Sequence, residues 1–127
     1  MLLATACSAA GAARADACAE NPKSGPCFTV HGRMAQGNGN PGVRIWIVGT
    51  RKMLRVSPDD PAPLAPACLV LEDIAGGNRL FADFVVCPLE PERPGAMLPV
   101  CVQSASHRIV EAPGGDARAV AGVCAAP

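Results

Sequence analysis

The cysteines constrain this chain more than any other residue type. The sequence contains seven, and six of them follow residue 17: Cys18, Cys27, Cys68, Cys87, Cys101 and Cys124. An even number of cysteines in a short exported chain is typical of a disulfide framework. No Cys-x-x-Cys spacing occurs, which removes the usual signals of a zinc knuckle or a thioredoxin-like redox site. We therefore predict a small domain stabilised by up to three disulfides.

The spacing of the cysteines does not determine their connectivity, since six cysteines can pair in fifteen ways. One local pair is attractive: Cys87 and Cys101 flank a segment with four prolines. Bridging them would close a short loop and contribute on the order of 3 kcal/mol through chain entropy. The remaining four would then tie Cys18, Cys27 and Cys124, at the two ends of the chain, to the body of the domain.

The first 17 residues resemble a secretory signal, because the stretch is uncharged as far as Ala13 and ends in the small-x-small sequence Ala15-Asp16-Ala17. Cleavage after Ala17 removes Cys7 and turns an odd cysteine count into an even one. This predicts a periplasmic or secreted protein. Two alternatives stay open: a lipoprotein anchored through Cys7, and an alanine-rich helix at the start of a cytosolic protein.

Alternating apolar and polar residues between turn signals predict strands at 27–34, 43–48, 51–56, 68–72, 79–87, 100–104 and 107–111. A turn is expected at 37–42 and a proline-rich loop at 57–67, whereas no segment has a convincing helical period. This pattern favours an all-β fold, either a small antiparallel sandwich or a partly closed barrel, with the OB type as one option. We expect one domain over 18–127, with a flexible C-terminal tail from about residue 113.

Charge and hydropathy exclude some classes of protein. Lysine plus arginine and aspartate plus glutamate balance at 11 each, which argues against a dedicated nucleic-acid binder. No apolar run beyond the N-terminus is long enough to span a membrane. With three Phe, one Trp and no Tyr, aromatic packing is modest, so we expect the disulfides to supply part of the stability.

Two blocks of sequence carry a resemblance. The first runs from Cys27 to Val56 and includes Arg44-Ile45-Trp46; the second runs from Phe81 to Ala105 and includes Cys87-Pro88 and the run PERPG at 91–95. Together they resemble a family of small exported bacterial proteins without a characterised function. The resemblance covers just under half of the chain. It implies export and one compact domain. It carries no activity, cofactor or catalytic residue that could be transferred to this chain.

The candidate binding residues lie in two places. Arg44, Trp46, Arg51, Lys52 and Arg55 form the only basic cluster in the sequence. Glu92 and Arg93 lie in the stiff proline-rich segment 88–99. A stiff segment loses little conformational entropy when it binds, so this segment suits docking to a partner. We therefore predict partner binding through Arg44, Trp46, Glu92 and Arg93, in a non-catalytic or structural module of the cell envelope. The expected partner is an envelope protein or an anionic glycan or lipid.

Two other functions remain open as alternatives. Asp83 lies inside an apolar strand and would serve a small envelope hydrolase if His31 or His107 were its partner. The basic cluster around Trp46 would serve a barrel that binds single-stranded nucleic acid, although the neutral total charge speaks against a nucleic-acid partner. The sequence favours a protein without enzymatic activity and predicts no cofactor, no metal and no membrane span.

Overall fold

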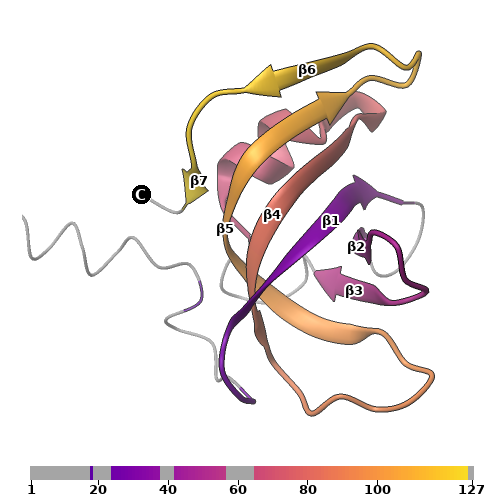
Figure 1. Ribbon diagram of the computed structural model, residues 1–127, viewed down its shortest axis with the longest axis vertical. Coiled ribbons are helices and arrows are strands. Elements are labelled where there is room, and N and C mark those ends of the chain that lie inside the picture. The colour runs from indigo at the N-terminus through magenta and orange to yellow at the C-terminus, as the bar shows by residue number, and fades with distance from the viewer. Residues whose placement is uncertain (1–17, 19–23, 38–41, 57–64, 126–127) are drawn as a thin grey trace, which may run out of the picture.

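The computed structural model describes residues 18, 24–37, 42–56 and 65–125. Figure 1 shows the strands β1 (Phe28–Gln36), β2 (Val43–Ile47), β3 (Met53–Val56), β4 (Arg79–Pro88), β5 (Leu98–Glu111), β6 (Ala117–Val120) and β7 (Cys124–Ala125). Two short helices, η1 (Cys68–Asp73) and η2 (Ala75–Gly77), connect β3 to β4. The predicted secretory signal with Cys7 lies outside the described residues, as do most of the turn predicted at 37–42 and most of the loop predicted at 57–67.

Five strands close into a barrel. The hydrogen-bonded order is β3-β2-β1-β4-β5, with each neighbouring pair antiparallel. A parallel pairing of β3 with β5, at Leu54–Leu98 and Arg55–Pro99, joins the two edges of the sheet. The fold is therefore all-β, as predicted, and of the two expected architectures the barrel is the one observed. This strand order is that of the OB type.

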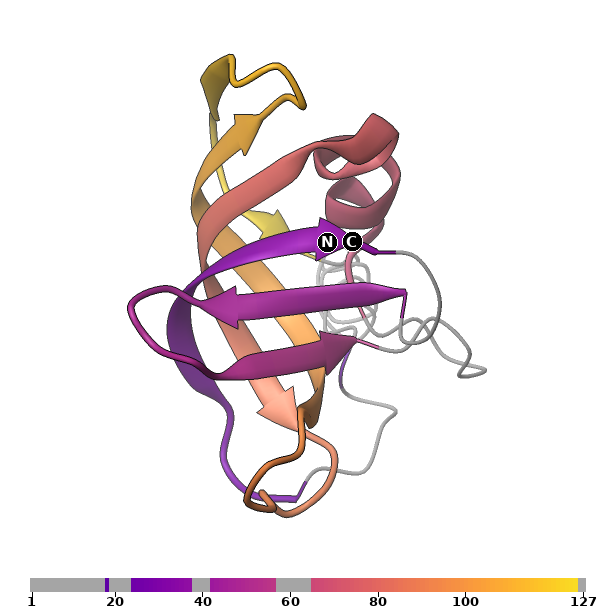
Figure 2. The same ribbon diagram turned by 90° about the vertical axis from the view of Figure 1, so that its right-hand side faces the viewer.

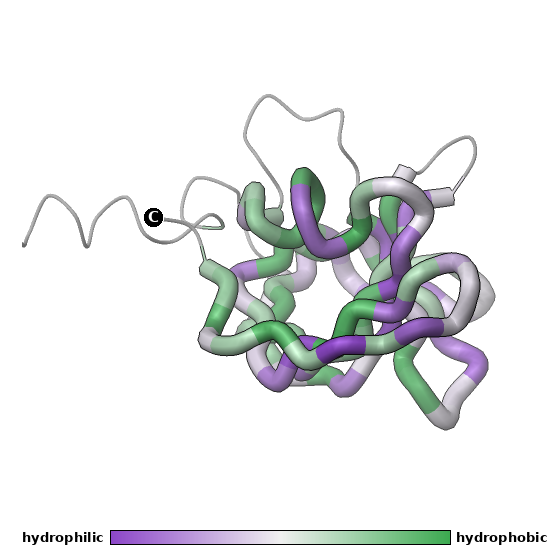
Figure 3. Tube along the Cα trace, turned by 90° about the horizontal axis from the view of Figure 1, so that it is seen from above, coloured by the Kyte–Doolittle hydropathy of each residue, from purple (hydrophilic) through white to green (hydrophobic). Residues whose placement is uncertain are grey.

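The core lies inside the barrel because one side chain in two points inward along each strand. Met34, Ile45, Leu54, Leu80 and Phe84 are at most 3% exposed. The alternation in the sequence predicts one face of Val43, Ile45 and Ile47 in β2 and one face of Leu80, Ala82, Phe84 and Val86 in β4, and the burial of Ile45, Leu80 and Phe84 agrees with this. Figure 3 shows hydrophobic and hydrophilic residues alternating along the chain.

A glycine in β1 permits close packing inside the barrel. A Cβ atom at Gly32 would lie 2.6 Å from Cγ2 of Ile45, which real Cβ atoms do not tolerate. Only glycine therefore fits between β2 and β4 at this position without a shift of its neighbours.

The predicted strand at 68–72 is wrong, because these residues form the helical turn η1. A five-residue apolar run cannot be distinguished from a buried helical segment by periodicity alone. Leu69 and Ile74 are fully buried in the core. Asp73 pairs with Arg108 of β5 at 2.7 Å, and both side chains are at most 8% exposed. These contacts hold the helix against the barrel.

The six expected cysteines form three disulfides, Cys18–Cys101, Cys27–Cys87 and Cys68–Cys124. The predicted local pair of Cys87 with Cys101 is wrong. These two residues are directly opposite each other in β4 and β5, but Cys87 also lies next to Cys27, because the β1–β4 register places Phe28 opposite Val86. Each is instead bridged to the N-terminal segment, across sequence separations of 60 and 83 residues. These disulfides therefore join residues that are far apart in the sequence.

The C-terminal half differs from the expectation in two places. The strands expected at 100–104 and 107–111 are one strand, β5, which accommodates register shifts opposite Phe81/Asp83 and Val85/Val86. His107 lies at the first of these shifts and has a positive φ of 52°, which is uncommon outside glycine. The region expected to be a tail contains β6 and β7, and both pair with β5.

The two ends of the barrel are built differently. β1, β3 and β5 begin at one end, which we call the loop end; β2 and β4 finish there. The opposite end, which we call the helix end, carries η1 and η2 between β3 and β4. Figure 2 shows the helices at the upper right and the loop between β4 and β5 at the bottom. No helix lies at the loop end within the described part of the chain.

Candidate binding surface

The outer face of β1, β2 and β3 carries a row of side chains set by the register. Arg33 of β1 is opposite Trp46 of β2, and Trp46 is opposite Met53 of β3. One step along, Arg44 of β2 is opposite Arg55 of β3. Neighbouring strands lie about 4.8 Å apart, so these side chains form one continuous patch. We call these five residues the β1–β3 face.

Trp46 has a fixed orientation at the centre of this face. Its indole Nε1–H donates to the carbonyl oxygen of Thr50 at 2.7 Å, and the Thr50 hydroxyl donates to the carbonyl oxygen of Ile47 at 2.8 Å. The guanidinium of Arg33 lies 5.1 Å from the centre of the indole ring, at cation–π distance. The guanidinium therefore lies over one face of the indole in advance of any ligand, and only the rest of the ring surface is left for a ligand to contact.

The charge on this side of the molecule is of one sign. The described residues 24–37 and 42–56 include five cations and no acid. The cations are Arg33, Arg44, Arg51, Lys52 and Arg55. The neutral total charge of the chain therefore conceals a strongly basic region, because the acidic residues lie elsewhere. The neutral total charge, which argues against a dedicated nucleic-acid binder, therefore does not describe the local charge of this surface.

The loop between β4 and β5 supplies the nearest acids. Glu90 lies 3.9 Å from Arg55 and 3.3 Å from Arg93, and Glu92 lies 3.1 Å from Lys52. All of these side chains are at least a third exposed. Exposed ion pairs contribute only about 0–1 kcal/mol each, so they orient the loop without fixing it strongly against β3.

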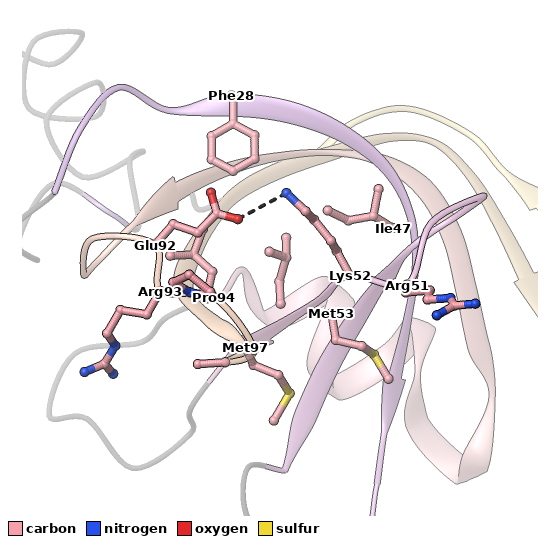
Figure 4. Close-up of a pocket in the computed structure, with 13 residues that line it drawn as sticks. Phe28, Ile47, Arg51, Lys52, Met53, Glu92, Arg93, Pro94 and Met97 are labelled. Atoms are coloured by element: carbon pink, nitrogen blue, oxygen red, sulfur yellow. Dashed lines mark hydrogen bonds and ion pairs between the residues drawn. The ribbon is translucent and has the colours of Figure 1, made fainter.

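A groove of about 440 Å³ lies at the loop end, between this loop and the β2–β3 turn. Figure 4 shows its lining, with Phe28 on one side, Met53 and Met97 on the other, and the Lys52–Glu92 ion pair between them. Arg51, Lys52, Glu92 and Arg93 are its charged lining residues. The remaining lining is largely apolar.

The four predicted partner-binding residues fall on two adjoining surfaces. Arg44 and Trp46 belong to the β1–β3 face, while Glu92 and Arg93 line the groove. Met53 connects the two, because it is opposite Trp46 and also lines the groove. Arg33 is a member of the face that was not predicted, although its outward direction follows from the alternation in β1. Met97 was not predicted either, since nothing local in the sequence brings residue 97 near residue 53.

Asp83 has both histidines as partners. Nδ1 of His31 lies 2.9 Å from one carboxylate oxygen, and Nδ1 of His107 lies 3.0 Å from the other. The hydrogen bond from His31 is the largest influence, and together with the bond from His107 it lowers the pKa of Asp83 below its ordinary value, despite some desolvation. With both Nδ1 atoms directed at Asp83, the Nε2 atoms are the ones left for other contacts.

The hydrolase alternative thus finds its three residues in contact, but not in the groove. Neither Asp83 nor its two histidines line that groove, and the histidine side chains are 61% and 83% exposed. Within the described ranges, no group of three His, Cys, Asp or Glu side chains is placed to hold a metal ion.

No family model matches this chain, and neither the curated proteins nor the solved structures include a match to it. The likeness of the two sequence blocks to small exported bacterial proteins therefore stays a prediction. In the part of the chain that the structure describes, no helix is long and apolar enough to cross a membrane.

Proposed function

We propose that this protein is a non-catalytic binding module of the cell envelope that holds an anionic glycan on the β1–β3 face. The observation that carries the proposal is the clustering of three cations, Arg33, Arg44 and Arg55, around an oriented tryptophan, on strands that contain no acid. Several cations acting on one chain-like ligand add their attraction, whereas isolated surface charges contribute little.

The chemistry of the face suits a sugar chain with acidic groups. The indole of Trp46 offers a flat apolar surface on which the face of a sugar ring can pack, as aromatic side chains do with apolar surfaces generally. Arg44 and Arg55 lie opposite each other on neighbouring strands, and the guanidinium fork forms paired hydrogen bonds with carboxylates. The strands hold these groups in place, so that little ordering entropy is lost on binding.

The disulfides support placement outside the cytosol. Three bridges in a chain of 127 residues suit an oxidising compartment, because cytosolic thiols are kept reduced. We accordingly propose a periplasmic or secreted protein, with lipid anchoring through Cys7 as the alternative. An envelope location favours a glycan over a nucleic acid as the ligand.

The test is binding of polygalacturonate, measured by affinity electrophoresis with neutral dextran as the comparison polymer. Arg44→Glu combined with Arg55→Glu should weaken binding more than tenfold. Arg118→Glu, a reversal on the exposed part of β6, is the charge-matched control for Arg44→Glu or Arg55→Glu taken singly, and it should change the affinity less than twofold. Equal effects of Arg118→Glu and of either single reversal would show that binding follows total charge and would exclude this site.

The second candidate is the barrel that binds single-stranded nucleic acid. The observation in its favour is again the β1–β3 face, because cations next to a half-buried aromatic ring also suit stacked bases and phosphates. Oligo(dT) in the same assay separates the two ligand classes. Binding of oligo(dT) at least tenfold tighter than polygalacturonate would favour this candidate over the glycan.

A further inference from the structure

The loop end of the barrel differs from the helix end in how its core side chains are covered. At the helix end, η1 contributes Leu69 and Ile74, and both are fully buried. At the loop end, the groove reaches Ile47, Leu54 and Leu98, which belong to the core or pack against it. The groove therefore exposes the edge of the apolar interior. Mouths of barrels are preferred places for small-molecule sites, and the volume of about 440 Å³ is in their usual range.

We propose that this groove binds a single-chain anionic amphiphile, with the hydrocarbon tail in the mouth of the barrel and the acidic headgroup at its basic rim. This site adjoins the β1–β3 face at Met53 and does not depend on glycan binding there.

The walls of the groove suit a hydrocarbon chain. Phe28 is 38% exposed although its side chain is large and apolar, and it stands across the groove from Met53 and Met97 (Figure 4). Methionine side chains are unbranched and adaptable, so they can follow the shape of a flexible tail. Covering these side chains and the edge of the core removes apolar surface from water, which is the main source of affinity for such a ligand.

The charges around the groove select the headgroup. Three cations, Arg51, Lys52 and Arg93, line it together with one acid, Glu92. Lys52 and Glu92 are 66% and 62% exposed, and such a pair costs little to separate. A ligand carboxylate can therefore replace Glu92 as the partner of Lys52. Arg51 forms no ion pair with any described residue and is available as a second contact.

The experiment measures binding of monomeric decanoate, below its micellar concentration, by isothermal titration calorimetry. Because each buried methylene contributes up to about fourfold in affinity, decanoate should bind more than tenfold tighter than butanoate. Decyltrimethylammonium has a similar tail and the opposite headgroup charge, and it should bind at least tenfold more weakly than decanoate. Equal affinities for decanoate and butanoate would overturn the proposal, and so would equal affinities for the two headgroups.

A variant in the groove and a matched control outside it test whether decanoate binds in the groove. Met97→Glu puts a carboxylate in the tail site and should reduce decanoate affinity more than tenfold. Val123→Glu is the matched control, because Val123 is 65% exposed and does not line the groove; it should change the affinity less than twofold. An equal loss in both variants would overturn the site. Thermal unfolding midpoints within about 3 °C of the parent establish that the variants are folded.

Further measurements distinguish this site from other surfaces. Lys52→Gln should weaken decanoate several-fold, whereas Arg44→Glu combined with Arg55→Glu should leave it within threefold, so that failure of glycan binding and failure of this site are separable. Vesicles of phosphatidylglycerol test the membrane as the source of the ligand. The site for the monomeric amphiphile would be contradicted by two results together: the vesicles capture the protein and decanoate does not compete, and calorimetry detects no heat of decanoate binding.

Discussion

The two sides of the barrel are built on different principles. The β4–β5 side is bridged to other segments: Cys87 and Cys101 bind the N-terminal segment, and Asp83 is held between two histidines. The strands β1, β2 and β3 themselves contain no cysteine and no acid, although Cys27, which is bonded to Cys87, directly precedes β1. Two of the three disulfides and both histidine contacts of Asp83 therefore involve β4 or β5.

On the β1–β3 face, Arg55 has only the 3.9 Å pair with the exposed Glu90. Arg33 and Arg44 form no ion pair with a described residue, so they are available for a ligand.

Removing a disulfide from β4 should have the largest effect, which is a loss of folding stability. The Cys27–Cys87 bridge spans 60 residues, so replacing both cysteines by serine should destabilise the fold by about 4 kcal/mol, through the entropy of the unfolded chain. Denaturant unfolding measures this change. The affinity for polygalacturonate, measured where the variant is still folded, should stay within twofold of the parent. A stability loss below about 1 kcal/mol would show that the bridge does not hold the barrel.

The next effect concerns the buried ion pair between η1 and β5. Arg108→Ala leaves the carboxylate of Asp73 buried without its 2.7 Å partner, and breaking such a pair costs about 3–5 kcal/mol. Arg118→Ala, an exposed arginine on β6, should cost less than about 0.5 kcal/mol. Thermal unfolding of the two variants compares them, and similar midpoints would contradict the role assigned to the buried pair.

Much of the barrel could be predicted from sequence because its strands alternate strictly. Ile45 and Trp46 are assigned to opposite faces correctly by parity alone. The segment at Cys68 was predicted wrongly, since a short apolar run is compatible with a strand or a buried helical turn. The pairing of Cys87 with Cys27 follows from the β1–β4 register, which places Phe28 opposite Val86, and no local pattern encodes that register.

The candidate site was predictable only in its parts. The basic residues near Trp46 are close in sequence, so their clustering could be recognised at once. The contact of Asp83 with both His31 and His107 needs the β1–β4 register and the irregularity in β5, and neither is visible in the sequence. The groove joins Met53 to Met97 across the loop end, which requires closure of the barrel by β3 and β5.

A smaller effect is expected from replacing Trp46 on the β1–β3 face, and it tests whether the indole contributes to glycan binding. Trp46→Ala removes the indole and its cation–π contact with Arg33, and we expect polygalacturonate binding to weaken about five- to tenfold, equivalent to about 1–1.4 kcal/mol. Trp46→Phe keeps a ring and should lose less. Affinity electrophoresis compares the two variants. If phenylalanine is no better than alanine, the aromatic surface does not contact the glycan.

The smallest effect belongs to the β4–β5 side and depends on pH. Because the folded-state pKa of Asp83 is lowered, mainly by the hydrogen bond from His31, its contribution to stability is present above its unfolded pKa. That contribution is lost as the pH falls through the lower folded value. The stability advantage of the parent over Asp83→Asn should therefore shrink on acidification. Unfolding midpoints measured from pH 6 to pH 2 follow this change, and a constant difference would contradict it.

The central claim is that the cations of the β1–β3 face hold an anionic chain. The most direct measurement is the affinity for polygalacturonate as a function of salt concentration, for the parent and for Arg44→Gln combined with Arg55→Gln. Binding by several cations displaces counterions, so the parent should lose affinity steeply with salt and the variant should show a shallower slope. A flat dependence in the parent, or identical slopes in the two proteins, would contradict the proposed face.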